Sequence, residues 1–151
     1  ARMLAMAHVA GADAMIACAR ETGRILAVDF DSRYVRSWQQ IKAAKESGLF
    51  GKMVLGEARL KWWRAQSYYT DSGWRGTWAL DGGGSLANQS IHFIDMLQWI
   101  MGDVEEVTAG YYGVHTHDIE TEDVGMGMLR FKSGAVGALA NARSASSLRR
   151  K

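Results

Sequence analysis

A hydrogen-bonding amide, Asn88, lies close in the sequence to two side chains that could perform acid–base chemistry, His92 and Asp95. If residues 85–102 form one helix, this spacing puts the amide, the imidazole and the carboxylate on one face. Imidazole titrates near neutral pH, and a carboxylate three residues later can orient its ring. The trio could therefore exchange a proton with a substrate hydroxyl, although a satisfied surface hydrogen bond is the more ordinary role of such a pair.

The helix that carries this trio must also pack against the rest of the protein. Its other face is apolar, which favours burial, and Ser85 is the candidate N-cap. Three glycines at 82–84 come directly before it, and they would let another chain segment or a ligand approach the helix start closely. The side chains opposite the trio are those of Leu86, Ser90, Phe93, Ile94, Leu97 and Met101.

Residues 66–84 form a long loop that is rich in aromatic side chains. Loops of this length in compact domains are usually functional or disordered, and large aromatic rings argue against disorder. Stacking surfaces beside polar groups suit sugar rings or flat cofactors, so this loop is a candidate wall of a binding site. The rings are those of Tyr68, Tyr69, Trp74 and Trp78.

Hydrophobic periodicity elsewhere in the chain predicts an α+β fold. Alternation at residues 52–65 is typical of a long strand, and further strands follow the His92 helix, so we expect a largely antiparallel open sheet backed by helices. A helix at 9–22, Gly23 and a short apolar strand at 24–30 form the pattern of the second half of a βαβ unit. The other expected elements are a helix at 35–47 and strands at 104–114, 123–131 and 135–142.

Composition argues against several classes of protein. Hydrophobic residues make up 48% of the chain and charged residues 23%, which are ordinary globular values, and a net charge of +2 predicts no nucleic-acid surface. No apolar run is long enough for a membrane span and the first residues lack a signal-peptide pattern, so we expect a cytoplasmic protein. Cys18 is the only cysteine, so no internal disulfide can form, and its apolar helical surroundings favour a buried thiol.

One stretch of the sequence carries a family resemblance. The segment GTWALDGGGSLANQSIHFIDMLQWIMG resembles the signature of the Gfo/Idh/MocA oxidoreductases, the relatives of glucose–fructose oxidoreductase and inositol dehydrogenase. Their C-terminal domain carries Gly-Gly-x-Leu-x-Asp/Asn-x-Gly/Ser-x-His-x-x-Asp. The resemblance extends over essentially the whole chain and implies two parts. Residues 1–34 would be a remnant Rossmann helix–strand from the dinucleotide-binding domain, and residues 35–151 a substrate-binding and oligomerisation domain, incomplete at its C-terminus.

The same resemblance implies roles for individual residues. His92 lies at the position of the family's catalytic acid/base, Asn88 lies where the family often has an assisting aspartate, and Asp95 would orient His92. The implied substrate is a sugar, polyol or related hydroxyl compound, and imidazole suits the proton exchange that its oxidation requires. The substrate-binding positions that the resemblance implies are Arg33, Tyr34, Arg64, Tyr69, Trp74 and Arg75.

Departures from the family pattern limit what this chain is expected to do alone. The family uses NAD or NADP, but this sequence has no G-x-G-x-x-G loop in a strand–turn–helix context, so we expect no cofactor for the chain by itself. Arg2 stands where the family has a lysine, and arginine cannot release its proton in a protein. The sheet is expected to lack its last strands, and relatives pair through the open sheet face, which implies a homo-oligomer. We therefore predict the substrate-binding half of an oxidoreductase, without dehydrogenase activity alone.

Other interpretations stay open at this point, including whether the chain is an enzyme by itself. A cofactor-free hydrolase could use the His92 face, although no serine has the context of a nucleophile. A metal-dependent enzyme could use residues 115–123, where His115 and His117 would point to the same side of a strand, although a solvated charged turn is the simpler interpretation. The chain could also be a non-enzymatic oligomeric scaffold.

Overall fold

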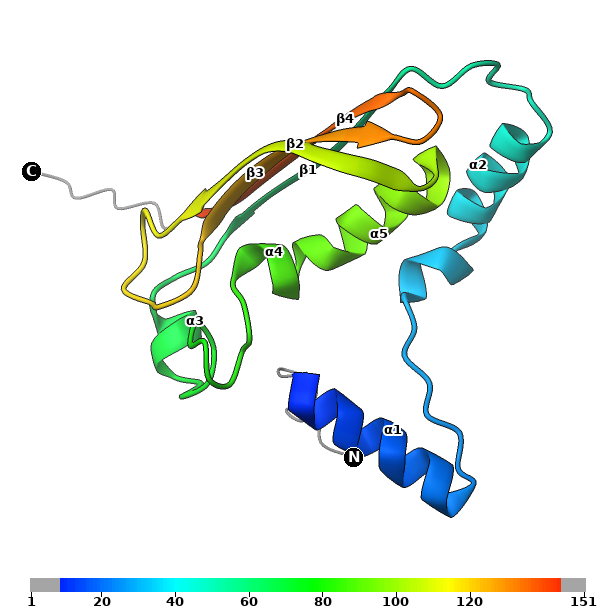
Figure 1. Cartoon of the computed structure of the whole chain (residues 1–151). Coiled ribbons are helices and arrows are strands. Elements are labelled where there is room, and N and C mark those ends of the chain that lie inside the picture. The colour runs from blue at the N-terminus through cyan, green and yellow to red at the C-terminus, as the bar shows by residue number, and fades with distance from the viewer. Residues whose placement is uncertain (1–8, 145–151) are drawn as a thin grey trace, which may run out of the picture.

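A mixed four-stranded sheet forms the centre of the fold (Figure 1). The computed structural model describes residues 9–144. The strand order is β1-β4-β3-β2, in which β1 and β4 are parallel and the other two pairs are antiparallel. This arrangement confirms the predicted α+β fold with a largely antiparallel sheet. The strands are β1 Leu55–Trp63, β2 Val104–Gly113, β3 Val124–Phe131 and β4 Val136–Ser144.

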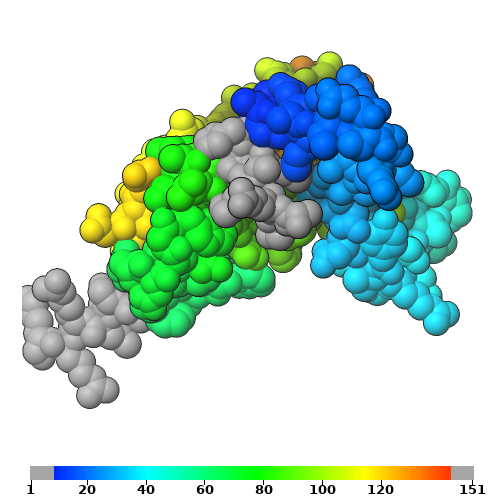
Figure 2. All heavy atoms as spheres, turned by 90° about the horizontal axis from the view of Figure 1, so that it is seen from below, coloured from blue at the N-terminus to red at the C-terminus, as the bar shows by residue number. Residues whose placement is uncertain are grey.

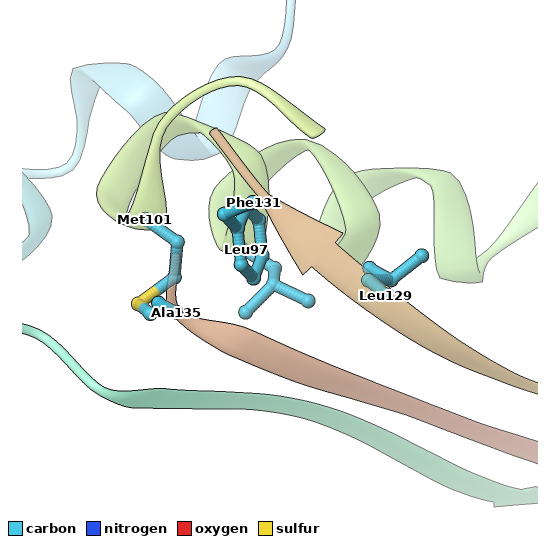
Figure 3. Close-up of a cluster of buried hydrophobic side chains, with 5 residues drawn as sticks. All are labelled: Leu97, Met101, Leu129, Phe131 and Ala135. Carbon is cyan, nitrogen blue, oxygen red and sulfur yellow. The ribbon is translucent and has the colours of Figure 1, made fainter. Parts of the chain in front are cut away.

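Helix α5 (Ser90–Met101) covers one face of this sheet (Figure 1). Its apolar side points at the strands, as the sequence pattern predicts, and Phe131 beneath it is completely buried. The buried hydrophobic cluster between α5 and the sheet consists of Leu97 and Met101 of α5 with Leu129, Phe131 and Ala135 of the β3–β4 hairpin (Figure 3). This cluster fixes the rotation of α5 and so determines which way its polar side chains face.

The opposite face of the sheet is open. Tyr111, Met126 and Met128 lie on it, and each is more than half exposed. Such a contiguous apolar surface is unusual on a monomer and is typical of an interaction face. Among the helices within residues 9–144, none is long and apolar enough to cross a membrane.

The segment before the sheet corrects two predictions. Residues 24–30, between helix α1 (Val9–Thr22) and the 3-10 turn η2 (Asp31–Tyr34), form no strand, and Ile25 is 95% exposed. A buried parallel strand needs neighbouring strands, and the described chain supplies none here. For the same reason α1 has no buried residue, and Cys18 is exposed rather than buried. Arg2 lies outside the described residues.

The helix predicted from residue 85 onward is in fact two helices. Helix α4 (Ser85–Asn88) and α5 are separated by Gln89. Gly84, not Ser85, is the N-cap residue, and the Ser85 hydroxyl has no hydrogen-bond partner among the described residues. Hydrogen bonds to Glu122 hold the start of α4 near the sheet, so this turn follows Glu122 rather than the axis of α5.

Two shorter elements complete the fold. Helix α2 (Arg36–Glu46) confirms the helix predicted at 35–47, and the predicted loop at 66–84 contains the short helix α3 (Ser67–Thr70). Seen from below, α1 and α2 lie to one side of the molecule, and the green segment with α3 and α4 lies to the other (Figure 2). The candidate site residues are therefore spread over two regions on the α5 side of the sheet.

Candidate functional site

His92 lies in the first turn of α5, and its side chain is 44% exposed. It lines a cleft of about 480 Å³, together with Ser32, Trp38 and residues of β1 and α5. The imidazole Nδ1 is 3.9 Å from Asp31 Oδ1, and the ring meets Phe30 edge-on with 6.2 Å between the centroids. Nδ1 itself is buried and has no hydrogen-bond partner among residues 9–144. The rest of the ring is exposed along the cleft, so a ligand that enters the cleft can contact it.

The structure brings Arg33 and Asp95 together in a two-pronged ion pair. Arg33 Nε donates to Asp95 Oδ2 at 2.8 Å, and Nη2 donates to Oδ1 at 2.5 Å. These hydrogen bonds raise the pKa of Arg33 further above its usual value. The hydrogen bonds described for Asp95 thus go to Arg33, not to His92, and they fix the η2 turn beside α5. Tyr34, the next residue of η2, is 70% exposed.

Asn88 is engaged with the preceding loop. Its Nδ2 donates to Asp81 Oδ1 at 3.2 Å, while Asp81 Oδ2 accepts the backbone N–H of Gly76 at 2.9 Å. The side-chain oxygen of Asn88, Oδ1, accepts a hydrogen bond from the side-chain amide of Gln89. Asn88 therefore holds the loop that leads to α4. The sequence pattern predicts Asn88 and His92 on one face of a single helix, but the break at Gln89 places them on two different helices.

The glycines before α4 surround a carboxylate of the protein itself. Glu122 accepts the N–H of Gly84 at 3.0 Å and the N–H of Leu86 at 2.9 Å, and its carbonyl oxygen accepts the N–H of Ser85. Gly82 has a φ of 73°, which glycine adopts without strain. Because Glu122 takes the donors that a phosphate would need, this loop does not fit a dinucleotide.

A second hollow, of about 420 Å³, lies beside α3. Two of the predicted substrate-binding residues, Arg64 and Arg75, line it together with Tyr68. Their guanidinium carbons are 5.1 Å and 4.4 Å from the centroid of the Tyr68 ring, and Arg75 also lies 4.7 Å from the Trp74 ring. No residue lines both this hollow and the cleft at His92. His92 and the two arginines therefore lie in separate cavities, and the other predicted site residues line neither of them.

Tyr69 does not line the hollow. It is 4% exposed, its hydroxyl accepts a hydrogen bond from Arg143 Nη1 at 3.3 Å, and its ring lies 4.8 Å from the His117 ring. Neighbouring side chains on this short helix point in different directions, so Tyr68 faces the arginines where Tyr69 faces the interior. The sequence indicates an aromatic loop but not which ring is outermost.

Residues 115–123 build a clamp around the buried Asp123 carboxylate. The Asp123 carboxylate accepts five hydrogen bonds from His115, Thr116 and His117, at 2.7–3.0 Å. His117 Nε2 lies 3.0 Å from the carbonyl oxygen of Arg64, so protein oxygens face both ring nitrogens of His117. No group of three or more candidate ligands that could hold a metal occurs among the described residues. Nothing in the sequence beyond a polar run indicates this clamp.

Hydrogen bonding governs the charge of this clamp. Burial alone would raise the pKa of the Asp123 carboxyl. The hydrogen bonds from Thr116, His117 and His115 outweigh burial and hold that pKa below its usual value. Asp123 is therefore a charged anchor that fixes the backbone of Arg64 through His117.

Comparison with known protein families decides the class of this chain. Residues 38–150 match the model of the GFO/IDH/MocA C-terminal domain. The chain belongs to the Gfo/Idh/MocA family. A Gfo/Idh/MocA relative, the myo-inositol 2-dehydrogenase of Thermotoga maritima, is 31% identical over 144 residues, which cover 91% of this chain and 40% of that relative.

Solved structures support the same assignment. The WlbA dehydrogenase from Bordetella pertussis, in complex with NADH and UDP-GlcNAcA, is 33% identical with a TM-score of 0.83, over 93% of this chain and 40% of that one. The WlbA dehydrogenase from Chromobacterium violaceum, with the same ligands, is 31% identical with a TM-score of 0.80, also over 93% and 40%. This Gfo/Idh/MocA chain thus spans about 40% of the length of the relatives that it matches.

Proposed function

We propose that this chain is the substrate-binding half of an NAD(P)-dependent oxidoreductase that acts on a sugar, polyol or related hydroxyl compound. The observation that carries the proposal is the position of His92, which lines an open cleft instead of being packed in the core. Imidazole is the side chain most often used to exchange the proton of a substrate hydroxyl. The inositol dehydrogenase relative and the sugar ligand of the WlbA structures support this substrate class.

The surrounding contacts suggest how the other residues serve this site. The Arg33–Asp95 ion pair holds the η2 turn beside the cleft, and Asn88 fixes the loop before α4. We place the domain boundary after Tyr34, with residues 1–34 in the dinucleotide-binding part and 35–151 in the substrate-binding part. The exposure of Ile25 supports this boundary, because such a side chain is normally buried by neighbouring strands.

NAD or NADP binding is assigned to residues outside this chain. The glycine loop at 82–84 does not suit a pyrophosphate, since Glu122 takes the N–H groups of Gly84 and Leu86. The contribution of this chain is then to bind the substrate and exchange its proton, and the chain alone is proposed to lack dehydrogenase activity. The hydrolase alternative has less support, because Ser85 and Ser90 are both buried.

The open sheet face supports a homo-oligomer in which this surface is covered by a second copy. Tyr111, Met126 and Met128 are exposed there and would lose contact with water on pairing. A non-enzymatic scaffold would use the same face but gives no role to the His92 cleft. The cytoplasmic setting is part of the proposal, and it rests on the absence of a second cysteine for an internal disulfide.

Calorimetric titration of the 151-residue chain tests whether it binds the substrate but not the dinucleotide. We expect heat of binding with a polyol or sugar such as myo-inositol, and none with NAD or NADP up to millimolar concentration. The physical reason is that only the substrate contacts lie in this chain. Micromolar binding of either dinucleotide to the chain alone would overturn the proposal, and so would hydride transfer without a second protein.

A further inference from the structure

Three arginine side chains surround the ring of Tyr68, which lines the hollow beside α3. The guanidinium carbons of Arg64, Arg75 and Arg143 lie 5.1, 4.4 and 5.9 Å from the centroid of the Tyr68 ring. None of the ion pairs found among residues 9–144 involves these three arginines. Cation–π contacts with tyrosine offset only part of the repulsion among like charges at this separation.

Several donors in this cluster have no acceptor. The Nε atoms of Arg64 and Arg75 are buried without a hydrogen-bond partner among the described residues. Arg143 is 1% exposed, and its Nε and Nη2 likewise have no partner there. A buried guanidinium with unused N–H groups is costly unless an anion compensates it. The cluster therefore lacks an acceptor of negative charge.

The single acidic side chain of the hollow does not supply that charge. Asp71 lines the hollow but is exposed, and its carboxylate accepts a hydrogen bond from the Thr70 hydroxyl at 3.2 Å. It forms no ion pair within 4.0 Å of either Arg64 or Arg75 among the ion pairs described. With two arginines and one aspartate on its walls, the hollow keeps an excess of positive charge.

Arg64 is held in place before any ligand arrives. The carbonyl oxygen of Arg64 lies 3.0 Å from His117 Nε2, and the buried Asp123 carboxylate fixes His117 in turn. The ring of Tyr68 and that of Trp62 flank the Arg64 guanidinium, at 5.1 and 5.0 Å. Hydrogen-bond donors that are already fixed lose little conformational entropy when an anion binds.

We propose that the hollow beside α3 binds an anionic group of the substrate, a carboxylate or a phosphate, through the guanidinium groups of Arg64 and Arg75. Both anions match the planar fork of arginine, which explains arginine rather than lysine at the two positions. The inference rests on the proposed function, because the anionic group is taken to belong to the same sugar or polyol. It narrows the substrate from any hydroxyl compound to one that carries negative charge.

Three ligands on one sugar scaffold test this inference. D-glucuronate supplies a carboxylate, D-glucose 6-phosphate a phosphate, and D-glucose neither. Each is titrated into the 151-residue chain while the arginine Nε–H signals and the His92 ring signals are followed by NMR. At least one anionic sugar is expected to bind about tenfold more tightly than glucose, which is about 1.4 kcal/mol, and to shift the Nε–H signals of Arg64 and Arg75.

Matched variants assign the effect to the hollow. Arg75→Gln and Arg64→Gln should each remove most of the preference for the anion. Arg130→Gln, an exposed arginine of β3 paired with Glu105 and Glu106, should not. Two separate variants protect the test against a folding defect in one, and circular dichroism checks both. The preference of one anion over the other identifies which group the hollow takes.

The outcomes separate this inference from the proposed function. Equal binding of all three sugars, or an equal loss in Arg130→Gln, overturns the anion site. Shifts at His92 in that case still support the hydroxyl site. Shifts at Arg64 and Arg75 with anionic sugars but none at His92 support the anion site and count against the proposed role of His92. No response at either place overturns both.

Discussion

Replacing Gly84 with alanine is expected to destabilise the folded chain by about 4 kcal/mol, one of the largest effects of any single methyl group here. Gly84 is buried, and a Cβ at this position would overlap the backbone carbonyl oxygen of Glu122. Backbone atoms cannot rotate away, so the loop must separate from residue 122. That separation breaks the hydrogen bonds from the N–H groups of Gly84, Ser85 and Leu86 to Glu122.

Thermal unfolding followed by circular dichroism measures this effect, and a drop in Tm of about 10 °C or more is expected for a chain of this size. Gly110→Ala is the matched control, because a Cβ there would meet only the Met126 carbonyl oxygen at 3.7 Å, an ordinary contact. An unchanged Tm in Gly84→Ala would mean that Glu122 does not occupy the glycine loop. It would also reopen that loop as a site for an external anion.

Replacing Asp123 with asparagine is expected to cost about 3 kcal/mol near neutral pH, because a buried charged acceptor is lost. The carboxylate accepts five hydrogen bonds, and an amide nitrogen would face some of those donors with its own hydrogens. Urea unfolding at pH 7 measures the loss. Asp103→Asn, an exposed aspartate paired with Lys132, is the control and should change stability little.

The same variant should change how stability depends on pH. The pKa of Asp123 is lowered in the folded chain, so its stabilising contribution is complete above the ordinary aspartate value of about 3.9 and is lost as the pH falls through the folded-state pKa. Unfolding free energies measured at several pH values below about 5 should therefore fall less steeply for Asp123→Asn than for the unchanged chain. Parallel acid profiles for the two proteins would contradict the clamp.

Elements with strong periodicity were predictable from the sequence, and those that depend on distant partners were not. The alternation of Leu55–Trp63 and the apolar face of α5 each specify an element whose partner lies within the chain. Residues 24–30 have the composition of a buried strand, but a strand also needs neighbours, and none is present in the described chain. The start of α4 is held by Glu122, which lies far away in the sequence.

The candidate site shows the same limit. The motif predicts a site at His92, and the structure places this residue on a cleft, not in the core. The partner of Asp95 was not predictable, because Arg33 approaches from 62 residues away and outcompetes a neighbour on the same helix. The three glycines indicated a close approach but not that the approaching group is Glu122. Spacing along a helix fixes which side chains share a face, and tertiary contacts decide which of them pair.

The central claim, that His92 faces the site of a hydroxyl substrate, is tested most directly by NMR of the imidazole side chains during titration with myo-inositol. His115 serves as the internal control, since it is exposed in the loop just after β2 and contacts Tyr111. The account predicts a saturable shift of the His92 ring signals with no change at His115. Two results would contradict the account. One is binding of myo-inositol that shifts signals elsewhere in the chain but not those of the His92 ring, and the other is an equal shift of the His92 and His115 rings.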